Sequence, residues 1–352
     1  EKPNNYTHND SMLLGYKGLT TFLSTTNEKI VSFLNNLGIS TMLTSVNYHN
    51  TSTELIDSIL GVKYYYSPYN DKTNYRLVDS FKFFKYAGLL HDMELRDINI
   101  YENLNALSLG YMISDNSKKF IERFVSEKKY TNFDYQNLIL KTMVNSDDDY
   151  FKPYNITSVD KINYQVEITN NQNFYVIVPL IEIGNKFTNV DIYINDIFKK
   201  SYTIKDFGVF LVENTYGEQT INLSIYVYDS ETRLGFPAVY YLDNEKLTEA
   251  INELKQNQLI IEKQKNNYIK GSIEATKDKS VLFTSIPYEN GWIVKVDGKK
   301  VVDILKSEDI VKHIFHFESQ SMGSVIAQAA FVSTIVGKTT SGAKKAAGGA
   351  MK

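Results

Sequence analysis

Cysteine is absent from the 352-residue sequence, and tryptophan occurs once. The absence of cysteine excludes a disulfide framework, a thiolate metal site and a cysteine nucleophile. Long apolar runs are missing too. The longest, 325–336, contains Gln328, Ser333 and Thr334 and is shorter than the roughly 20 residues of a membrane-spanning helix. The formal net charge of −3 shows no basic excess, so we expect no nucleic-acid partner.

The start of the sequence lacks the features of a complete chain. Residue 1 is Glu, and no apolar leader segment follows it. We therefore expect a soluble piece of a longer protein.

Aromatic residues are abundant, with 26 Tyr and 19 Phe. A sugar-facing surface rich in stacking rings would explain them. The codon usage of an AT-rich genome would raise Tyr, Asn, Lys, Ile and Phe together, as seen here, and we favour that explanation.

Residues 1–150 carry the signals of a mixed α/β domain. One apolar helical period runs from Asn27 to Gly38, and another runs from Ser52 or Thr53 to Gly61. A capping side chain before such a period and a glycine after it are typical helix boundaries. The same kind of pattern predicts strands at 62–67, 98–101 and 106–113, and helices at 118–127 and 135–144.

Residues 151–242 change to the alternation of a β-sandwich. Between 190 and 194, three apolar residues alternate with Asp191 and Tyr193, so the apolar side chains share one face of a strand. Asn195-Asp196 then offers a two-residue hairpin turn. Several short strands at near-regular spacing are typical of a sandwich.

Residues 243–304 are expected to form a helix, at 243–256, and a second β-module. From Val281 to Gly298 the order of strand, proline, loop, strand and turn repeats that of the first module. This second module is incomplete because it lacks a closing strand, and 310–317 is the nearest candidate to cover its edge.

Residues 305–352 form an atypical tail, which we expect to be largely disordered at its Gly-, Ala- and Lys-rich end. With the preceding segments, the predicted fold class is α+β: a mixed α/β domain followed by β-sandwich modules with a connecting helix.

Four motifs occur in series over about residues 1–304. Each is weak alone, and the last is the most telling. They are 9–19 with 22–25, 60–64, 101–103 with 105–111, and Ser285-Ile-Pro-Tyr-Glu-Asn-Gly-Trp292 with Val296-Asp-Gly-Lys299. In this order they resemble the extracytoplasmic domain of the YfhO-like bacterial membrane proteins.

The resemblance implies a place and a role. The chain would be the extracytoplasmic domain of a multi-spanning, glycosyltransferase-like protein that uses lipid-phosphate sugars, at the outer face of the bacterial cell membrane. It would assist the sugar decoration of cell-surface polymers such as teichoic acid. Its partners would be its own transmembrane domain and a cell-surface glycan polymer. The tail departs from the Gly-x-His strand with which the family's second module ends.

No residue matches the motif expected for the catalytic carboxylate, so we assign no catalytic residue and expect the isolated chain to be inactive. The alternative is a non-catalytic carbohydrate-binding or scaffolding module at the cell surface. A free-standing glycan hydrolase is less favoured, because it would need two carboxylates about 5 to 9 Å apart in a cleft.

Four residues are candidates for substrate binding. Asn9, Asp10 and Tyr16 lie in the first motif and could contact a sugar, although an Asn-Asp pair more often caps a turn. Trp292 could stack on a sugar ring, although a Trp that opens a hairpin is more often a core anchor.

The sequence offers little for a metal ion. His313 and His316 are favoured as a surface loop, since a metal pair on a helix would have a glutamate between the histidines. The acidic run 147–149 is favoured as a solvated linker. We expect neither a metal site nor a cofactor.

Overall fold

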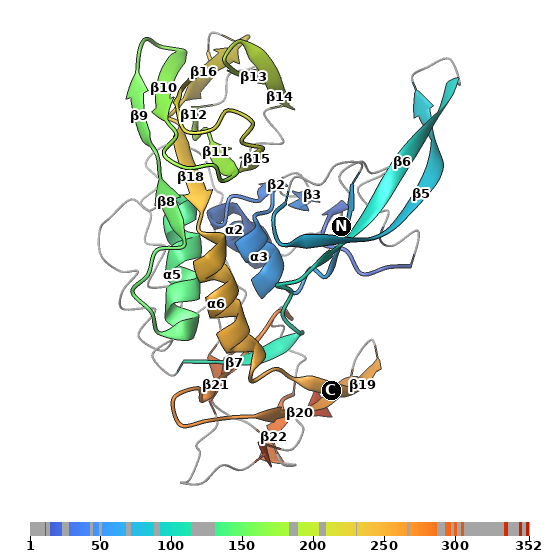
Figure 1. Cartoon of the computed structure of the whole chain (residues 1–352). Helices are drawn as coiled ribbons and strands as arrows, with labels where there is room; N and C mark the ends of the chain where they lie inside the picture. Colours follow the sequence, from blue (N-terminus) through green and yellow to red (C-terminus); the bar gives the residue numbers. More distant parts are fainter. Residues whose placement is uncertain are drawn as a thin grey trace.

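Figure 1 shows the computed structural model of the chain. The structure describes residues 11, 15–22, 28–42, 45–48, 51–67, 72–87, 92–114, 131–182, 189–203, 209–229, 231–265, 268–286, 293–296, 299–300, 304–305, 334–336, 345–346 and 350–351. The helices are α2 (Glu28–Asn36), α3 (Glu54–Ile59), α5 (Asn132–Val144) and α6 (Asn244–Lys255). Within these described ranges, no helix has the length and apolar character needed to cross a membrane.

Helix boundaries follow the capping signals in the sequence. The Thr53 hydroxyl accepts a hydrogen bond from the backbone N–H of Ile56 and begins α3. Gly38 and Gly61 adopt positive φ after α2 and α3, as expected of left-handed helix ends. Helix α5 begins three residues before the predicted 135, because Thr131 and Asp134 form a capping box. The predicted helix at 118–127 and the cap Asn27 lie outside the described residues.

A long β-hairpin, which the sequence did not predict as a unit, dominates the N-terminal part. Strands β5 (Tyr75–Ala87) and β6 (Asp92–Asn103) pair along their length, and β4 (Tyr64–Ser67) adds to β6. Figure 1 shows this hairpin projecting away from the helices. A smaller sheet has the order β1 (Thr21–Phe22), β3 (Ser45–Asn47), β2 (Ser40–Met42).

The β-sandwich predicted for the middle of the chain is confirmed. One sheet has the order β14 (Ile197–Thr203), β13 (Asn189–Ile194), β16 (Thr220–Val227), β10 (Asn163–Glu167), β9 (Asn155–Ser158). The other has the order β15 (Phe210–Val212), β11 (Phe174–Ile177), β18 (Ala238–Leu242), β8 (Phe151–Pro153), and β12 (Leu180–Glu182) pairs with β17 (Arg233–Leu234). Asn195 and Asp196 both have positive φ, 48° and 63°, as a type I′ turn requires. The α+β class is thereby confirmed.

The second β-module joins a strand from much earlier in the chain. Strand β21 (Val281–Thr284) pairs with β7 (Gly110–Ile113). Strand β7 therefore covers one side of β21, and the predicted candidate 310–317 lies outside the described residues. Strand β7 starts later than the predicted 106, because the N–H of Leu107 donates to the carbonyl of Ser58 instead of to a strand partner.

Short strands complete the C-terminal part. Strand β25 (Thr334–Val336) pairs with β21 and β24 (Ile304–Leu305), and β22 (Lys295–Val296) pairs with β23 (Lys299–Lys300). Strand β20 (Tyr268–Glu274) pairs with β19 (Ile260–Lys265), β26 (Lys345–Ala346) and β27 (Ala350–Met351). The extent to which the tail is ordered, and the predicted domain boundaries, stay predictions.

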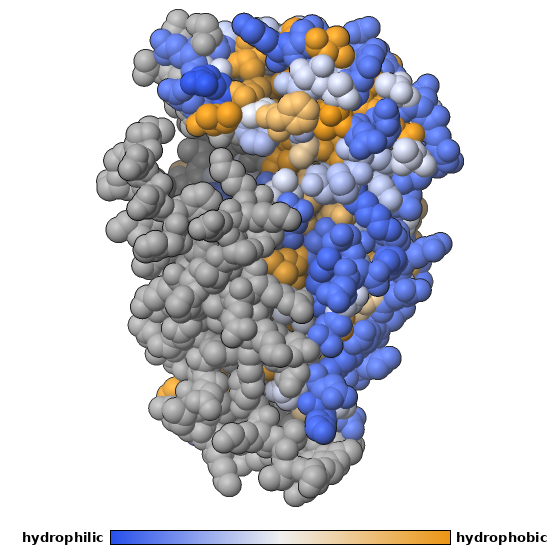
Figure 2. Space-filling model, turned by 90° about the vertical axis from the view of Figure 1, so that its left-hand side faces the viewer, coloured by the Kyte–Doolittle hydropathy of each residue, from blue (hydrophilic) through white to orange (hydrophobic). Residues whose placement is uncertain are grey.

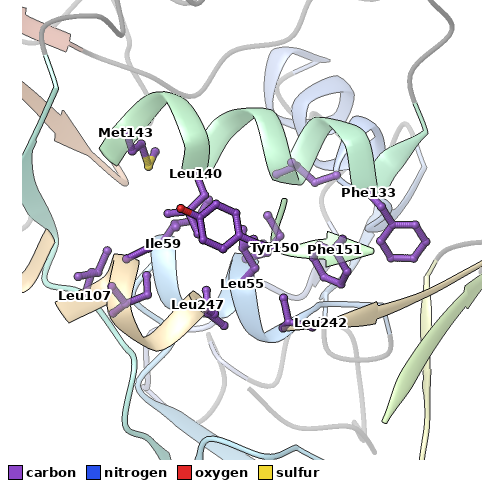
Figure 3. Packing of buried hydrophobic residues seen from close by; sticks show 14 of the residues in the cluster. Leu55, Ile59, Leu107, Phe133, Leu140, Met143, Tyr150, Phe151, Leu242 and Leu247 are labelled. Carbon is purple, nitrogen blue, oxygen red and sulfur yellow. The ribbon is translucent and has the colours of Figure 1, made fainter. Parts of the chain in front are cut away.

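Two large hydrophobic cores hold the fold together. One lies between the sandwich sheets and includes Val176, Ile192 and Leu223. The other lies where α3, α5 and α6 meet, and Figure 3 shows Leu55, Leu140 and Leu247 from these helices pointing toward one another. Strands β8, β11 and β18 of the four-stranded sheet also contribute to this helical core, so the sandwich is attached to it through buried residues such as Phe151 and Leu242.

Candidate functional site

The structure describes one of the four residues that the sequence nominated. Tyr16 is half-buried, its N–H donates to the carbonyl of Ser11, and its ring lies 6.4 Å from that of Tyr66 on β4. Asn9, Asp10 and Trp292 lie outside the described residues. Sugar contact by these four residues therefore stays a prediction.

A different surface, the outer face of the five-stranded sheet, gathers exposed aromatic rings. On β13 the side chains of Val190, Ile192 and Ile194 are buried in the sandwich, so those of Asp191 and Tyr193 face outward. The register pairs Tyr193 with Phe198 on β14 and Asp191 with Tyr226 on β16. Directly paired residues lie on the same face, so these side chains all point outward.

The rings contact one another across the three strands. Tyr193 is central, with its ring centroid 5.6 Å from that of Phe198 and 5.4 Å from that of Tyr226, both in edge-to-face geometry. Edge-to-face contact leaves part of each outer ring uncovered. Phe198 is 53% exposed, Tyr226 39% and Tyr228, just beyond β16, 68%. We call Tyr193, Phe198, Tyr226 and Tyr228 the aromatic face.

Polar groups accompany the aromatic face. The Tyr228 hydroxyl donates to Oδ2 of Asp191 at 2.8 Å, and this hydrogen bond raises the pKa of Tyr228 above its ordinary value. Further along the sheet, the Ser224 hydroxyl donates to Oδ1 of Asn163 at 2.7 Å, and Asn155 donates to Glu167 at 3.1 Å. By register, the Asp191 carboxylate, the Ser224 hydroxyl and the Asn163 amide lie near the rings, whereas Asn155 and Glu167 lie toward the other end of the sheet.

The sandwich exposes several large hydrophobic residues, as do the hairpin and β19. In Figure 2, hydrophobic residues reach the surface mainly near the top of the molecule, at the height of the sandwich in Figure 1. Exposed apolar residues that are contiguous on a protein surface often mark a binding site. The large hydrophobic residues that the sandwich exposes are Val159, Ile181, Ile197, Phe198, Tyr226, Tyr228 and Phe236.

Exposed rings with neighbouring hydrogen-bonding groups suit one ligand chemistry in particular. A sugar ring presents a face of C–H groups and a rim of hydroxyls. The C–H face stacks on an aromatic ring, and the hydroxyls exchange hydrogen bonds with amides and carboxylates. The aromatic face offers both kinds of contact on one sheet.

A second group of charged and polar side chains is largely buried. Nζ of Lys72 contacts Oδ2 of Asp57, the Tyr75 hydroxyl donates to the same oxygen at 2.6 Å, and Glu54 accepts from the N–H of Thr73 at 2.7 Å. Burial raises the pKa values of Glu54 and Tyr75. All five residues except Thr73 are buried, so we assign this group to the attachment of the hairpin to α3 rather than to a ligand.

The sequence contained part of the signal for the aromatic face. The alternation at 190–194 placed Tyr193 on the outer side of a strand, where a large aromatic residue has no core to fill. What the sequence alone did not supply was the register that brings Phe198 and Tyr226 beside it.

The family model described as bacterial membrane protein YfhO matches residues 1–306. A comparison with curated proteins gave no match. The family match covers both the hairpin and the aromatic face.

Proposed function

The chain belongs to the YfhO family of bacterial membrane proteins, and from that premise we propose that its β-sandwich holds a cell-surface glycan for the membrane-embedded part of its parent protein. In this proposal the domain lies on the extracytoplasmic side of the membrane. The full-length membrane protein is glycosyltransferase-like and decorates polymers such as teichoic acid with sugar. The observation that carries the proposal is the aromatic face, where Phe198, Tyr226 and Tyr228 expose their rings beside Asp191.

The role is one of holding rather than of catalysis. The rings and the carboxylate lie on an open sheet face, which suits a long polymer better than a small substrate that must be shielded from water. Stacking contacts of this kind add affinity without a chemical step. The proposal therefore expects the isolated chain to bind glycan and not to transfer sugar.

A binding experiment with matched variants tests the proposal. Purified chain is titrated with glycosylated teichoic acid, and binding is followed by calorimetry. The double variant Phe198→Ala/Tyr226→Ala removes two rings of the aromatic face. The double variant Ile181→Ala/Phe236→Ala removes side chains of the sandwich that are as exposed, 64% and 53%, but lie outside that face.

We expect at least a tenfold loss of affinity in the first variant and no change in the second, with melting temperatures within a few degrees of the parent chain. Equal loss in both variants, or no binding by the parent chain, would contradict the proposal.

A further inference from the structure

We propose that the aromatic face selects uncharged glycosyl groups and rejects the bare phosphodiester backbone of an anionic polymer. This inference rests on the proposed function, since it names the part of the polymer that the face contacts. The observations that carry it are the signs and positions of the charged side chains around Tyr193 and Tyr226.

Among the described strands of the five-stranded sheet, the charged side chains that the register turns outward are carboxylates. Asp191 lies between the rings of the aromatic face, paired with Tyr226 and hydrogen-bonded to Tyr228. Glu167 lies on β10, paired with Thr220 and Asn155. The remaining outward positions of these strands hold Asn, Gln, Ser, Thr and aromatic residues.

The two lysines of β14, Lys199 and Lys200, do not pair with the outward-facing residues of β13. The strand is irregular beside Tyr193, so that Phe198 and Lys200 pair with successive residues of β13 and Lys199 is the extra residue. Nζ of Lys199 lies 5.2 Å from the ring of Tyr216, and Nζ of Lys200 lies 5.6 Å from the ring of the buried Phe210. The first contact places the Lys199 ammonium against the loop between β15 and β16, and the second turns the Lys200 ammonium toward the opposite sheet.

A face with these charges disfavours a polyphosphate backbone. Proteins that bind phosphate groups commonly place Arg or Lys against them, because a cation offsets the lost hydration of the anion. Here a phosphate stacked near Tyr226 would lie beside the Asp191 carboxylate. The same carboxylate favours a sugar hydroxyl, because a hydroxyl donates to a carboxylate in a charge-assisted hydrogen bond.

Sugar selectivity would place the domain after the first sugar transfers in the reaction sequence. A face that recognises sugar holds stretches of polymer that are already decorated, and not the bare acceptor. Retention of the decorated stretch would keep neighbouring undecorated units near the membrane-embedded enzyme, at a high effective concentration.

Two forms of one polymer test the inference. The chain is titrated with glycosylated poly(glycerol phosphate) and with the same polymer without sugar, each at about 0.05 M and 0.5 M salt. We expect the glycosylated form to bind with an affinity that changes little with salt, and the sugar-free form to bind at least tenfold more weakly. Equal binding of both forms, weakened by salt, would overturn the inference and leave the proposed function standing. Binding of neither form would contradict both.

Charge variants provide a second readout. Asp191→Lys is expected to weaken binding of the glycosylated form about tenfold and to create salt-sensitive binding of the sugar-free form. Glu182→Lys alters a carboxylate of β12 that pairs with Arg233 away from the aromatic face, and is expected to change neither. If the two variants behave alike, the selectivity does not come from this face and the inference fails.

Discussion

Lys72 and Asp57 form an ion pair that is almost completely enclosed, with side chains 5% and 1% exposed. The ammonium group also lies 4.6 Å from the ring of Tyr65 and 5.2 Å from that of Tyr75, and the Tyr75 hydroxyl donates to Asp57. Lys72 precedes the hairpin and Asp57 belongs to α3. The pair therefore attaches the base of the hairpin to the helical core.

Removal of the lysine should destabilise the protein strongly. Lys72→Met leaves the Asp57 carboxylate buried without its counter-ion, and loss of one partner of a buried pair typically costs about 3–5 kcal/mol. Lys82→Met is the matched control, because Lys82 and its partner Asp97 are both 66% exposed and such a pair contributes about 1 kcal/mol or less. Urea unfolding measures both, and similar midpoints for the two variants would contradict the assigned role.

Replacing each of the two adjacent residues of the turn between β13 and β14 by glycine should change the stability of the protein in opposite directions. Asp196→Gly removes a side chain from the left-handed region, φ 63°, and should stabilise the protein by about 0.5–1 kcal/mol. Asn tolerates the left-handed region at φ 48° better than other non-glycine residues, so Asn195→Gly gains little there, and it removes the 2.8 Å hydrogen bond from the N–H of Asn222 to its Oδ1. That variant should be less stable by about 1 kcal/mol. Thermal unfolding distinguishes them, and a shift of the same sign in both would contradict this account.

The stability of the protein at high pH should depend on the buried Tyr111. Burial raises its pKa well above 10.0 in the folded protein. The unfolded chain therefore releases this proton first, so the stabilisation is fully present below about pH 10 and is lost as pH rises through the folded-state pKa. Tyr111→Phe should cost about 1–2 kcal/mol at pH 8, because the Ile59 carbonyl loses its 2.9 Å donor.

The difference between Tyr111→Phe and the parent chain should then shrink by about 1.4 kcal/mol for each pH unit above 10. Urea unfolding at pH 8, 10 and 11 measures it. A difference that stays constant with pH would show that Tyr111 ionises as easily in the folded protein as in the unfolded chain.

Local signals in the sequence predicted the elements that local chemistry determines. Thr53 and Gly61 bound α3 because a cap and a left-handed end depend on a few neighbouring residues. The Asn195-Asp196 turn is local in the same way. The long strand β5 was missed, because its register shifts between Leu77 and Asp79 and breaks the alternation by which a strand is recognised.

Pairing between strands that are far apart in the sequence could not be predicted, either for the fold or for the site. Strand β7 pairs with β21 across a large separation in sequence, and no local pattern encodes such a choice. The aromatic face depends on the same kind of information, since Phe198 and Tyr226 meet Tyr193 only through the register of three strands. Sugar contact by the residues nominated from motifs, Asn9, Asp10, Tyr16 and Trp292, remains a prediction, and three of the four lie outside the described residues.

Saturation-transfer NMR is the most direct test of glycan contact at the aromatic face. Aromatic protons of the chain are irradiated in the presence of glycosylated teichoic acid, and the signal that reaches the sugar protons is recorded. Transfer to the C–H face of the sugar is expected in the parent chain and in Ile181→Ala/Phe236→Ala, and it should fall to background in Phe198→Ala/Tyr226→Ala. Undiminished transfer in that last variant would show that the sugar contacts other rings, and the central claim would be wrong.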